Sequence, residues 1–175
     1  AFVPRRLALA DAEHFEGTRL FYHPESLTGF ADQAVVVNGG DDTALSTAIA
    51  LSRNARQVTL VHRRDGFQAD PALVAEMRAL VATGRMAFVV GQPTGLDGTH
   101  VHVGLPDEST RSLAADALVA CLGISPRLGP IADWGLALQR KQLPVDTATF
   151  QTAEPGIFAV GDINTYPGKK RLLLC

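Results

Sequence analysis

Two short groups of residues in the first half of the chain have the types and spacing needed to bind phosphate. The segment Gly39-Gly-Asp-Asp-Thr-Ala44 is a glycine turn, and Arg63 and Arg64 stand together farther along the chain. Backbone N–H groups of a glycine turn at a helix start point at a bound phosphate, and the helix dipole favours its negative charge. Guanidinium groups bind phosphate bidentately. The two groups together predict a site for a dinucleotide whose adenosine ribose carries a 2′-phosphate, which is NADP.

The residues around these groups have the pattern of a β-α-β unit. Residues 34–38 form an unbroken apolar run, typical of a parallel strand that is covered on both faces, and 57–61 form a second predicted strand. Between them, four apolar residues share one face at helical spacing: Ala44, Leu45, Ala48 and Ile49. Such a unit places the pyrophosphate over the glycine turn, and the second strand delivers side chains to the adenosine ribose.

The rest of the chain predicts further helix and strand segments. Asp70 followed by Pro71 predicts a helix start, and Gly84 predicts its end. The buried stripe of this helix should contain Leu73, Val74, Met77, Leu80 and Val81. Residues 1–33 hold little regular structure, residues 86–90 should form a strand, and residues 91–98 a loop.

Alternation in 99–105 predicts one strand of an antiparallel ribbon that turns at 106–107, with Val101, Val103 and Leu105 on one face. Further strands are expected at 113–122, 145–150 and 157–160. The expected fold class is therefore α/β, a Rossmann-like parallel sheet with flanking helices and an antiparallel β-ribbon.

Composition excludes several other classes of protein. The chain has 175 residues, of which 46% are hydrophobic and 19% charged, which are globular values. A net charge of −2 gives no basic surface for nucleic acid, and no apolar run approaches the roughly 20 residues that span a membrane. Cys121 and Cys175 are too few for a disulfide framework or a metal knuckle. We expect a cytoplasmic protein without a metal site.

Each of these signals also has a simpler explanation. Asp41 stands where the usual pattern has its second glycine, so Asp41 and Asp42 could cap the helix themselves. The two arginines could be a solvated basic surface. His100 and His102 lie on one face of a strand without a third ligand nearby, which favours a solvent-facing strand edge over a metal site. Asp162 could end a turn, or it could accept a hydrogen bond from a cofactor hydroxyl.

Taken together, these segments resemble one family. Residues 39–44 resemble the G-G-G-D-S-A turn of the low-molecular-weight thioredoxin reductases, and residues 62–69 resemble their H-R-R-x-x-F-R-A box, which binds the NADPH 2′-phosphate. Residues 155–162 resemble their late FAD motif, and the opening residues 1–6 resemble the segment where their chain leaves the FAD domain. Residues 21–26 contain no cysteine where those reductases carry C-x-x-C, so the chain looks like the ferredoxin/flavodoxin–NADP⁺ reductases of thioredoxin-reductase-like type.

This resemblance implies a piece of an NAD(P)H-dependent flavoprotein reductase that exchanges electrons between NADPH and a ferredoxin or flavodoxin through FAD. It implies FAD-domain remnants at 1–15 and 124–175 around an NAD(P)H-binding domain at 16–123, and a homodimer when the protein is full length. The piece alone should neither hold FAD firmly nor catalyse turnover, and no side chain is assigned a catalytic role. The implied nucleotide contacts are Gly39, Gly40, Asp42, Thr43, Ala44, His62, Arg63, Arg64 and Gln68, and the implied FAD contacts are Phe2 and Asp162.

Two positions depart from the family pattern. Asp41 replaces the second glycine of the turn, and Gln68 replaces the last arginine of the box. Both changes remove attraction for phosphate. Two alternatives therefore stay open: a fragment of a disulfide reductase whose redox cysteines lie outside this piece, and a degenerate nucleotide-binding domain with a structural or interaction role.

Overall fold

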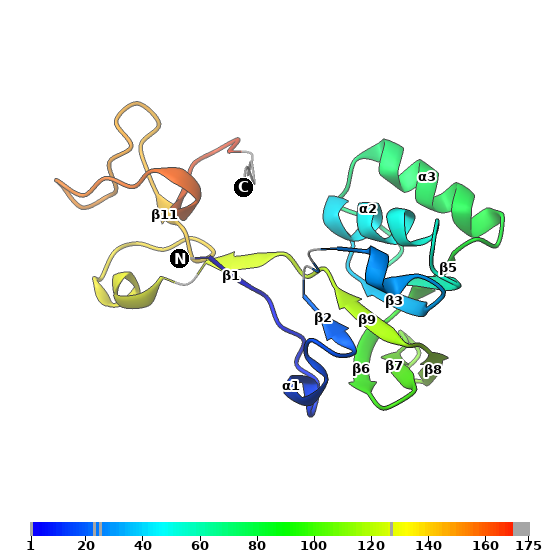
Figure 1. The fold of residues 1–175 in the computed structure, drawn as a ribbon. Helices are drawn as coiled ribbons and strands as arrows, with labels where there is room; N and C mark the ends of the chain where they lie inside the picture. The colour runs from blue at the N-terminus through cyan, green and yellow to red at the C-terminus, as the bar shows by residue number, and fades with distance from the viewer. Residues whose placement is uncertain (1, 23, 25, 127, 170–175) are drawn as a thin grey trace. The chain divides into compact units, whose positions relative to one another are not determined.

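The computed structural model describes residues 2–22, 24, 26–126 and 128–169 (Figure 1). Contacts divide the chain into two units, which are Pro4–Gly123 and the combination of Ala1–Val3 with Ile124–Cys175. In the described part of the chain, no helix combines the length and the apolar character that crossing a lipid bilayer requires.

A five-stranded sheet forms the centre of the unit Pro4–Gly123. Its strand order is β2-β9-β3-β4-β5, and every neighbouring pair is parallel. The strands are β2 (Leu20–Phe21), β3 (Ala34–Asn38), β4 (Gln57–His62), β5 (Ala87–Val90) and β9 (Ala117–Ala120). Asn38 pairs with Val61 and Ala120 in register, so the carboxyl ends of three adjacent strands meet at one edge.

Different elements cover the two faces of this sheet, as Figure 1 shows. Helices α2 (Asp42–Leu51) and α3 (Pro71–Ala82) pack on one face, where Leu45, Ile49 and Met77 meet alternate residues of β3 and β4. On the other face lies an antiparallel ribbon of β6 (Gln92–Leu96), β7 (His100–Gly104) and β8 (Thr110–Ala114). Val101 and Val103 of the ribbon pack there against the strand residues that point away from the helices. The expected α/β fold is confirmed.

Capping residues fix where both helices begin. Asp41 precedes α2, and its carboxylate accepts a hydrogen bond from the backbone N–H of Ala44 at 3.0 Å. Asp70 precedes α3 and accepts from the N–H of Ala72 at 2.7 Å, with Pro71 in the first turn. Each bond satisfies an N–H group that the helix itself leaves unpaired. The start of α3 predicted from Asp70 and Pro71 is confirmed.

The unit Pro4–Gly123 also contains short elements before β3. These are α1 (Ala12–Phe15) and the 3-10 turn η1 (Thr28–Phe30), in addition to β2. Leu20 of β2 is fully buried and pairs with Leu118 of β9. The expectation of little regular structure in 1–33 therefore missed one edge strand of the sheet.

The second unit contains short strands and turns around a small apolar core. Its strands are β1 (Phe2–Pro4), β10 (Ile124–Pro126), β11 (Leu143–Pro144) and β12 (Asn164–Thr165), and its 3-10 turns are η2 (Gly129–Asp133) and η3 (Gly161–Ile163). β1 pairs with β10, and β11 runs parallel to β12. Leu136, Leu143 and Ala159 form the core.

Four expectations about strands were wrong. The expected loop 91–98 contains β6, whose pairing with β7 tolerates an irregularity between Pro93 and Gly95. The expected strand 113–122 is divided between β8 and β9, which belong to different sheets. Residues 145–150 form no strand, and within 157–160 only Phe158 makes an isolated bridge, to Gln151.

Candidate nucleotide-binding site

The glycine turn lies directly after β3, at the carboxyl edge of the parallel sheet. Gly39 donates its backbone N–H to the carbonyl of Val61 at 3.1 Å, which ties the turn to the end of β4. A Cβ added to Gly39 would lie 2.4 Å from the carbonyl oxygen of Cys121 and 2.6 Å from Cβ of Ala44. At Gly39 the turn therefore approaches both the residue that follows β9 and the first turn of α2 too closely for a side chain at this position. Carboxyl edges of this kind are where α/β sheets bind ligands.

Gly40 has a different close neighbour, the side chain of His62. A Cβ at Gly40 would lie 2.3–2.5 Å from ring atoms of His62, so the imidazole packs directly on the Gly40 backbone. The imidazole also stacks on the ring of Phe67, with ring centroids 5.5 Å apart and planes 26° from parallel. Burial, followed by the charges of Arg64 and Arg63, lowers the pKa of His62 from its ordinary value. His62 is thus a neutral spacer between the glycine turn and the arginine loop at pH 7.

The loop of residues 63–70, here called the arginine loop, is bonded to the glycine turn at its far end. Gln68 donates its backbone N–H to the carbonyl of Gly40 at 2.9 Å, and Asp41 and Gln68 form a parallel bridge. The carboxylate of Asp42 accepts from the backbone N–H of Asp70 at 2.6 Å. The two segments singled out in the sequence are therefore brought together by several contacts.

The two acidic residues of the turn have separate roles. Asp41 caps α2, as its simpler explanation predicted. Asp42 does not cap this helix; its carboxylate holds the residue that caps α3. Thr43 is exposed in the first turn of α2, and Ala44 is buried beneath it. Because the Asp41 carboxylate already accepts the N–H of Ala44, this helix start has one donor fewer to offer a phosphate.

Arg63 and Arg64 follow the last residue of β4 and are both exposed. Neither forms a hydrogen bond or ion pair with any residue that the structure describes. Two adjacent guanidinium groups without internal partners are available to an anion from solution. Gln68 is also exposed, so its side chain is not needed for packing.

One arginine that the sequence did not single out contacts the same loop. Arg78 of α3 forms an ion pair with Asp65, and its guanidinium lies 5.4 Å from the ring centroid of Phe67 and 5.2 Å from that of Phe88. No local sequence signal indicates this contact, because it depends on how α3 packs beside the loop.

The two residues expected to contact FAD belong to the second unit. Asp162 lies in η3, and its backbone carbonyl accepts a hydrogen bond from the side chain of Gln142 at 2.7 Å. Phe2 lies in β1, and its side chain is outside the part of the chain that the structure describes. The nine implied nucleotide contacts all lie in the unit Pro4–Gly123.

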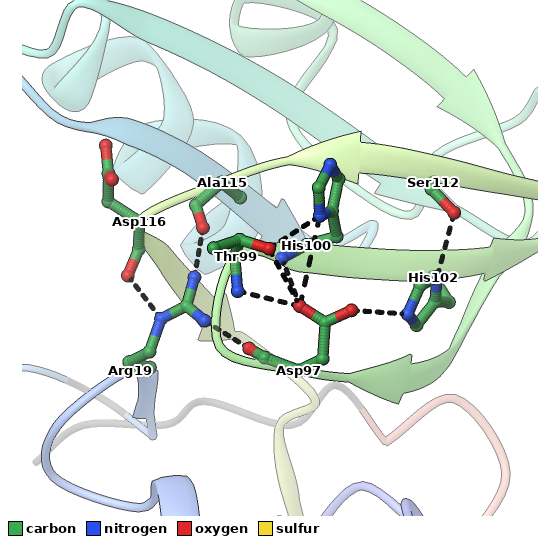
Figure 2. Close-up of polar contacts among 8 residues, drawn as sticks. All are labelled: Arg19, Asp97, Thr99, His100, His102, Ser112, Ala115 and Asp116. Carbon is green, nitrogen blue, oxygen red and sulfur yellow. Dashed lines mark hydrogen bonds and ion pairs between the residues drawn. The ribbon is translucent and has the colours of Figure 1, made fainter.

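The two histidines of β7 belong to a polar network around Asp97 (Figure 2). The Asp97 carboxylate accepts backbone N–H groups of Thr99 and His100, each at 2.7 Å, and lies 3.0 Å from Nε2 of His102. Nδ1 of His102 lies 2.9 Å from the hydroxyl of Ser112 on β8. In the described ranges, no group of three or more His, Cys, Asp or Glu side chains is arranged to hold a metal ion.

The same network joins the ribbon to the edge of the sheet. The guanidinium of Arg19, just before β2, donates to the backbone carbonyls of Asp97, Ala115 and Asp116 (Figure 2). Three backbone acceptors from the ribbon and from the segment before β9 are satisfied by this one side chain. The network is therefore explained by hairpin and sheet-edge stabilisation.

Comparisons with known proteins show the family of this chain. The family model described as pyridine nucleotide-disulphide oxidoreductase matches residues 5–172. A ferredoxin–NADP reductase of Acidovorax sp. (strain JS42) is 51% identical over 184 aligned residues, which cover 100% of this chain and 52% of that protein. The corresponding protein of Paracidovorax citrulli (strain AAC00-1) is 48% identical over 191 residues, covering 100% and 53%. The chain spans about half the length of these curated relatives.

Solved structures support the fold. A crystal structure of Lactococcus lactis thioredoxin reductase superposes with a TM-score of 0.80 at 24% identity, over 98% of this chain and 57% of that one. Thioredoxin reductase of T. acidophilum gives a TM-score of 0.77 at 20% identity, over 94% and 56%. The resemblance drawn from the glycine turn, the arginine box and the late Gly-Asp motif is confirmed. The chain is a member of the pyridine nucleotide-disulphide oxidoreductase family.

Proposed function

We propose that this chain is the NADPH-binding part of a flavin-dependent reductase that moves electrons between NADPH and a ferredoxin or flavodoxin through FAD. The names of the relatives at about half identity support this activity. When bound, the two cofactors supply the redox chemistry, and the protein binds and orients them. The chain's own contribution is then affinity and selectivity for the nucleotide.

The observation that carries this proposal is the pair Arg63 and Arg64, exposed and unpartnered among the described residues. Their loop is bonded to a glycine turn in which Gly39 has no room for a side chain. The turn, with Thr43 and Ala44, would hold the pyrophosphate. The two guanidinium groups would bind the adenosine 2′-phosphate, which NADPH has and NADH lacks.

Asp41 lowers the affinity of this site without removing it. Its carboxylate lies at the start of α2, where a pyrophosphate would also be placed, so two negative charges would repel each other. The cost is moderated because the carboxylate satisfies a backbone N–H and is partly exposed. We therefore expect weak nucleotide binding with selectivity for the 2′-phosphate.

The domain layout is part of the same proposal. Residues 16–123 would form the NAD(P)H-binding domain, and residues 1–15 and 124–175 would contribute to an FAD domain through Phe2 and Asp162. The intact protein would act as a homodimer, and this chain alone would be inactive. The lack of cysteine in 21–26, with Cys121 buried, speaks against dithiol chemistry at these positions.

Isothermal titration of the 175-residue chain with NADPH and NADH tests the proposal. Arg63→Ala should weaken NADPH binding by about tenfold, the value of one charged hydrogen bond, and should leave NADH binding unchanged. Arg53→Ala is the matched control, because Arg53 is exposed just beyond the far end of α2. Equal loss with both variants, or no loss with Arg63→Ala, would refute the 2′-phosphate site.

Asp41 favours one competing function, a degenerate domain retained for packing or partner binding. The variant Asp41→Gly distinguishes the two. We expect wild type to bind NADPH measurably and Asp41→Gly to bind it more tightly. If wild type binds neither nucleotide and only Asp41→Gly gains affinity, the degenerate domain is the better explanation.

A further inference from the structure

Helix α3 contributes one cationic side chain, that of Arg78, which contacts the arginine loop but lies outside the sequence motif of residues 62–69. The guanidinium of Arg78 is paired with the carboxylate of Asp65, which directly follows Arg64 in the chain. Arg64 is one of the two proposed phosphate-binding residues. Arg78 therefore binds the carboxylate of the residue next to Arg64 in the chain, and the Cα atoms of these two neighbours are about 3.8 Å apart.

We propose that Arg78 is a third phosphate-binding residue of this site, and that Asp65 occupies it in the absence of nucleotide. The proposal rests on the proposed function, since the ligand is the 2′-phosphate of an adenosine nucleotide. Arg78 would bind this phosphate together with Arg63 and Arg64. The two departures from the family pattern, Asp41 and Gln68, leave the site short of attraction for phosphate, and Arg78 supplies a cation from a different element.

The aromatic rings around Arg78 prepare it for this role. Its guanidinium lies over the rings of Phe67 and Phe88, at 5.4 and 5.2 Å from their centroids. A planar guanidinium stacked on aromatic rings loses less conformational entropy when it binds an oxyanion, because its orientation is already restricted. Phe67 also stacks on His62, which packs on Gly40. Arg78 is therefore linked through two rings to the glycine turn.

The ion pair between Arg78 and Asp65 is weak enough for another anion to replace the carboxylate. The side chain of Arg78 is 43% exposed and that of Asp65 61% exposed, so water competes for both groups. Exposed pairs of this type contribute little to stability. A phosphomonoester carries a charge of about −1.5 to −2 at pH 7 and three acceptor oxygens, so it can outcompete one carboxylate. Asp65 then acts as an internal competitor of the nucleotide.

If the Arg78–Asp65 pair were purely structural, replacing Asp65 would have the opposite effect on nucleotide binding. If Arg78 and Asp65 only hold the arginine loop in place, removing either partner should loosen the loop and weaken nucleotide binding. If Asp65 competes with phosphate, removing its charge should strengthen binding. Asp65→Asn therefore separates the two roles, with Arg78→Gln as its counterpart.

The experiment compares adenosine 2′,5′-bisphosphate with AMP, which differ only in the 2′-phosphate. Isothermal titration would use the 175-residue chain, and far-UV circular dichroism would verify that each variant is folded. Arg78→Gln should weaken binding of the bisphosphate by about tenfold and leave AMP affinity unchanged, as expected for one charged hydrogen bond. Asp65→Asn should strengthen bisphosphate binding by at least about twofold. Arg53→Gln, which removes the same charge far from the loop, should change neither.

The outcomes distinguish this proposal from the proposed function. If wild type prefers the bisphosphate but Arg78→Gln does not reduce this preference, Arg78 is not a phosphate ligand and the 2′-phosphate site still stands. If Asp65→Asn weakens binding as Arg78→Gln does, the pair is structural and the proposal is wrong. If wild type shows no preference for the bisphosphate over AMP, both proposals are overturned.

Discussion

Replacing Gly39 by alanine tests how closely the glycine turn approaches its neighbours. The new methyl carbon would lie 2.4 Å from the carbonyl oxygen of Cys121, whereas ordinary contacts of a Cβ begin at 3.4 Å, so the two segments would have to separate by about 1 Å. The obstructing atom is backbone, and Cys121 is itself held by its N–H bond to the carbonyl of Asn38 at 2.8 Å.

Because neither strand end can move independently, the cost should be at the top of the range for overpacked sites. That range is about 1–3 kcal/mol, so we expect a loss of about 3 kcal/mol in the free energy of unfolding. Gly29→Ala is the matched control. No atom lies within 4 Å of its added Cβ, and its φ is not in the left-handed region. The control should change stability by less than about 1 kcal/mol, in the stabilising direction.

Urea-induced unfolding followed by far-UV circular dichroism measures both variants. The midpoint of Gly39→Ala should fall well below that of wild type, and the midpoint of Gly29→Ala should equal or exceed it. If Gly39→Ala unfolds at the same urea concentration as the control, the turn does not pack against β9 in the way described. Position 39 would then have room for a side chain.

Two further predictions concern the titratable groups of Asp97 and Cys121. Backbone N–H groups of Thr99 and His100 hold the pKa of Asp97 well below its ordinary 3.8, so its contribution to stability is present above that value and is lost as the pH falls toward the lower, folded-state pKa. The stability difference between wild type and Asp97→Asn should therefore shrink as the pH falls below about 4; a difference that keeps growing as the pH falls below about 4 would contradict this. Burial raises the pKa of the Cys121 thiol from 9.0 to about 11. In a Cys175→Ser background, a disulfide reagent at pH 8 should label native Cys121 at least about a hundredfold more slowly than the urea-unfolded chain, and equal rates would show that the thiol is not buried.

Local signals predicted the parts of the fold whose causes are local. The bounds of β3 and the start of α3 were predicted from an apolar run and from Asp70 with Pro71, and the structure has both at those residues. The β-α-β pattern predicted that the glycine turn and the two arginines lie near each other, and the structure brings these two segments together. The structure adds how they are joined, through Gly40, Gln68 and His62.

Features that depend on distant parts of the chain were missed. Leu20 and Phe21 form a strand because β9 offers them a parallel partner, which nothing in residues 1–33 indicates. The break between β8 and β9 comes at Asp116, whose carboxylate accepts the N–H of Ala34 at 2.8 Å and pairs with Arg56. The segment 91–98 looked like a loop because it contains proline and glycine, yet its backbone still pairs with β7.

The place of β9 in the sheet has a consequence for how this polypeptide acquires its native state. Leu20 finds its partner Leu118 only 98 positions later, whereas β3, β4 and β5 pair in the order in which they are synthesised. Long-range parallel pairing is slow, because the loop must close before the contact can stabilise it. On the ribosome, the nascent strands β3 to β5 would assemble with their helices first, while β2 stays unpaired until residues 117–120 have emerged. During that interval the unpaired sheet edge would be the part of this protein most available to a chaperone or to another misfolded chain.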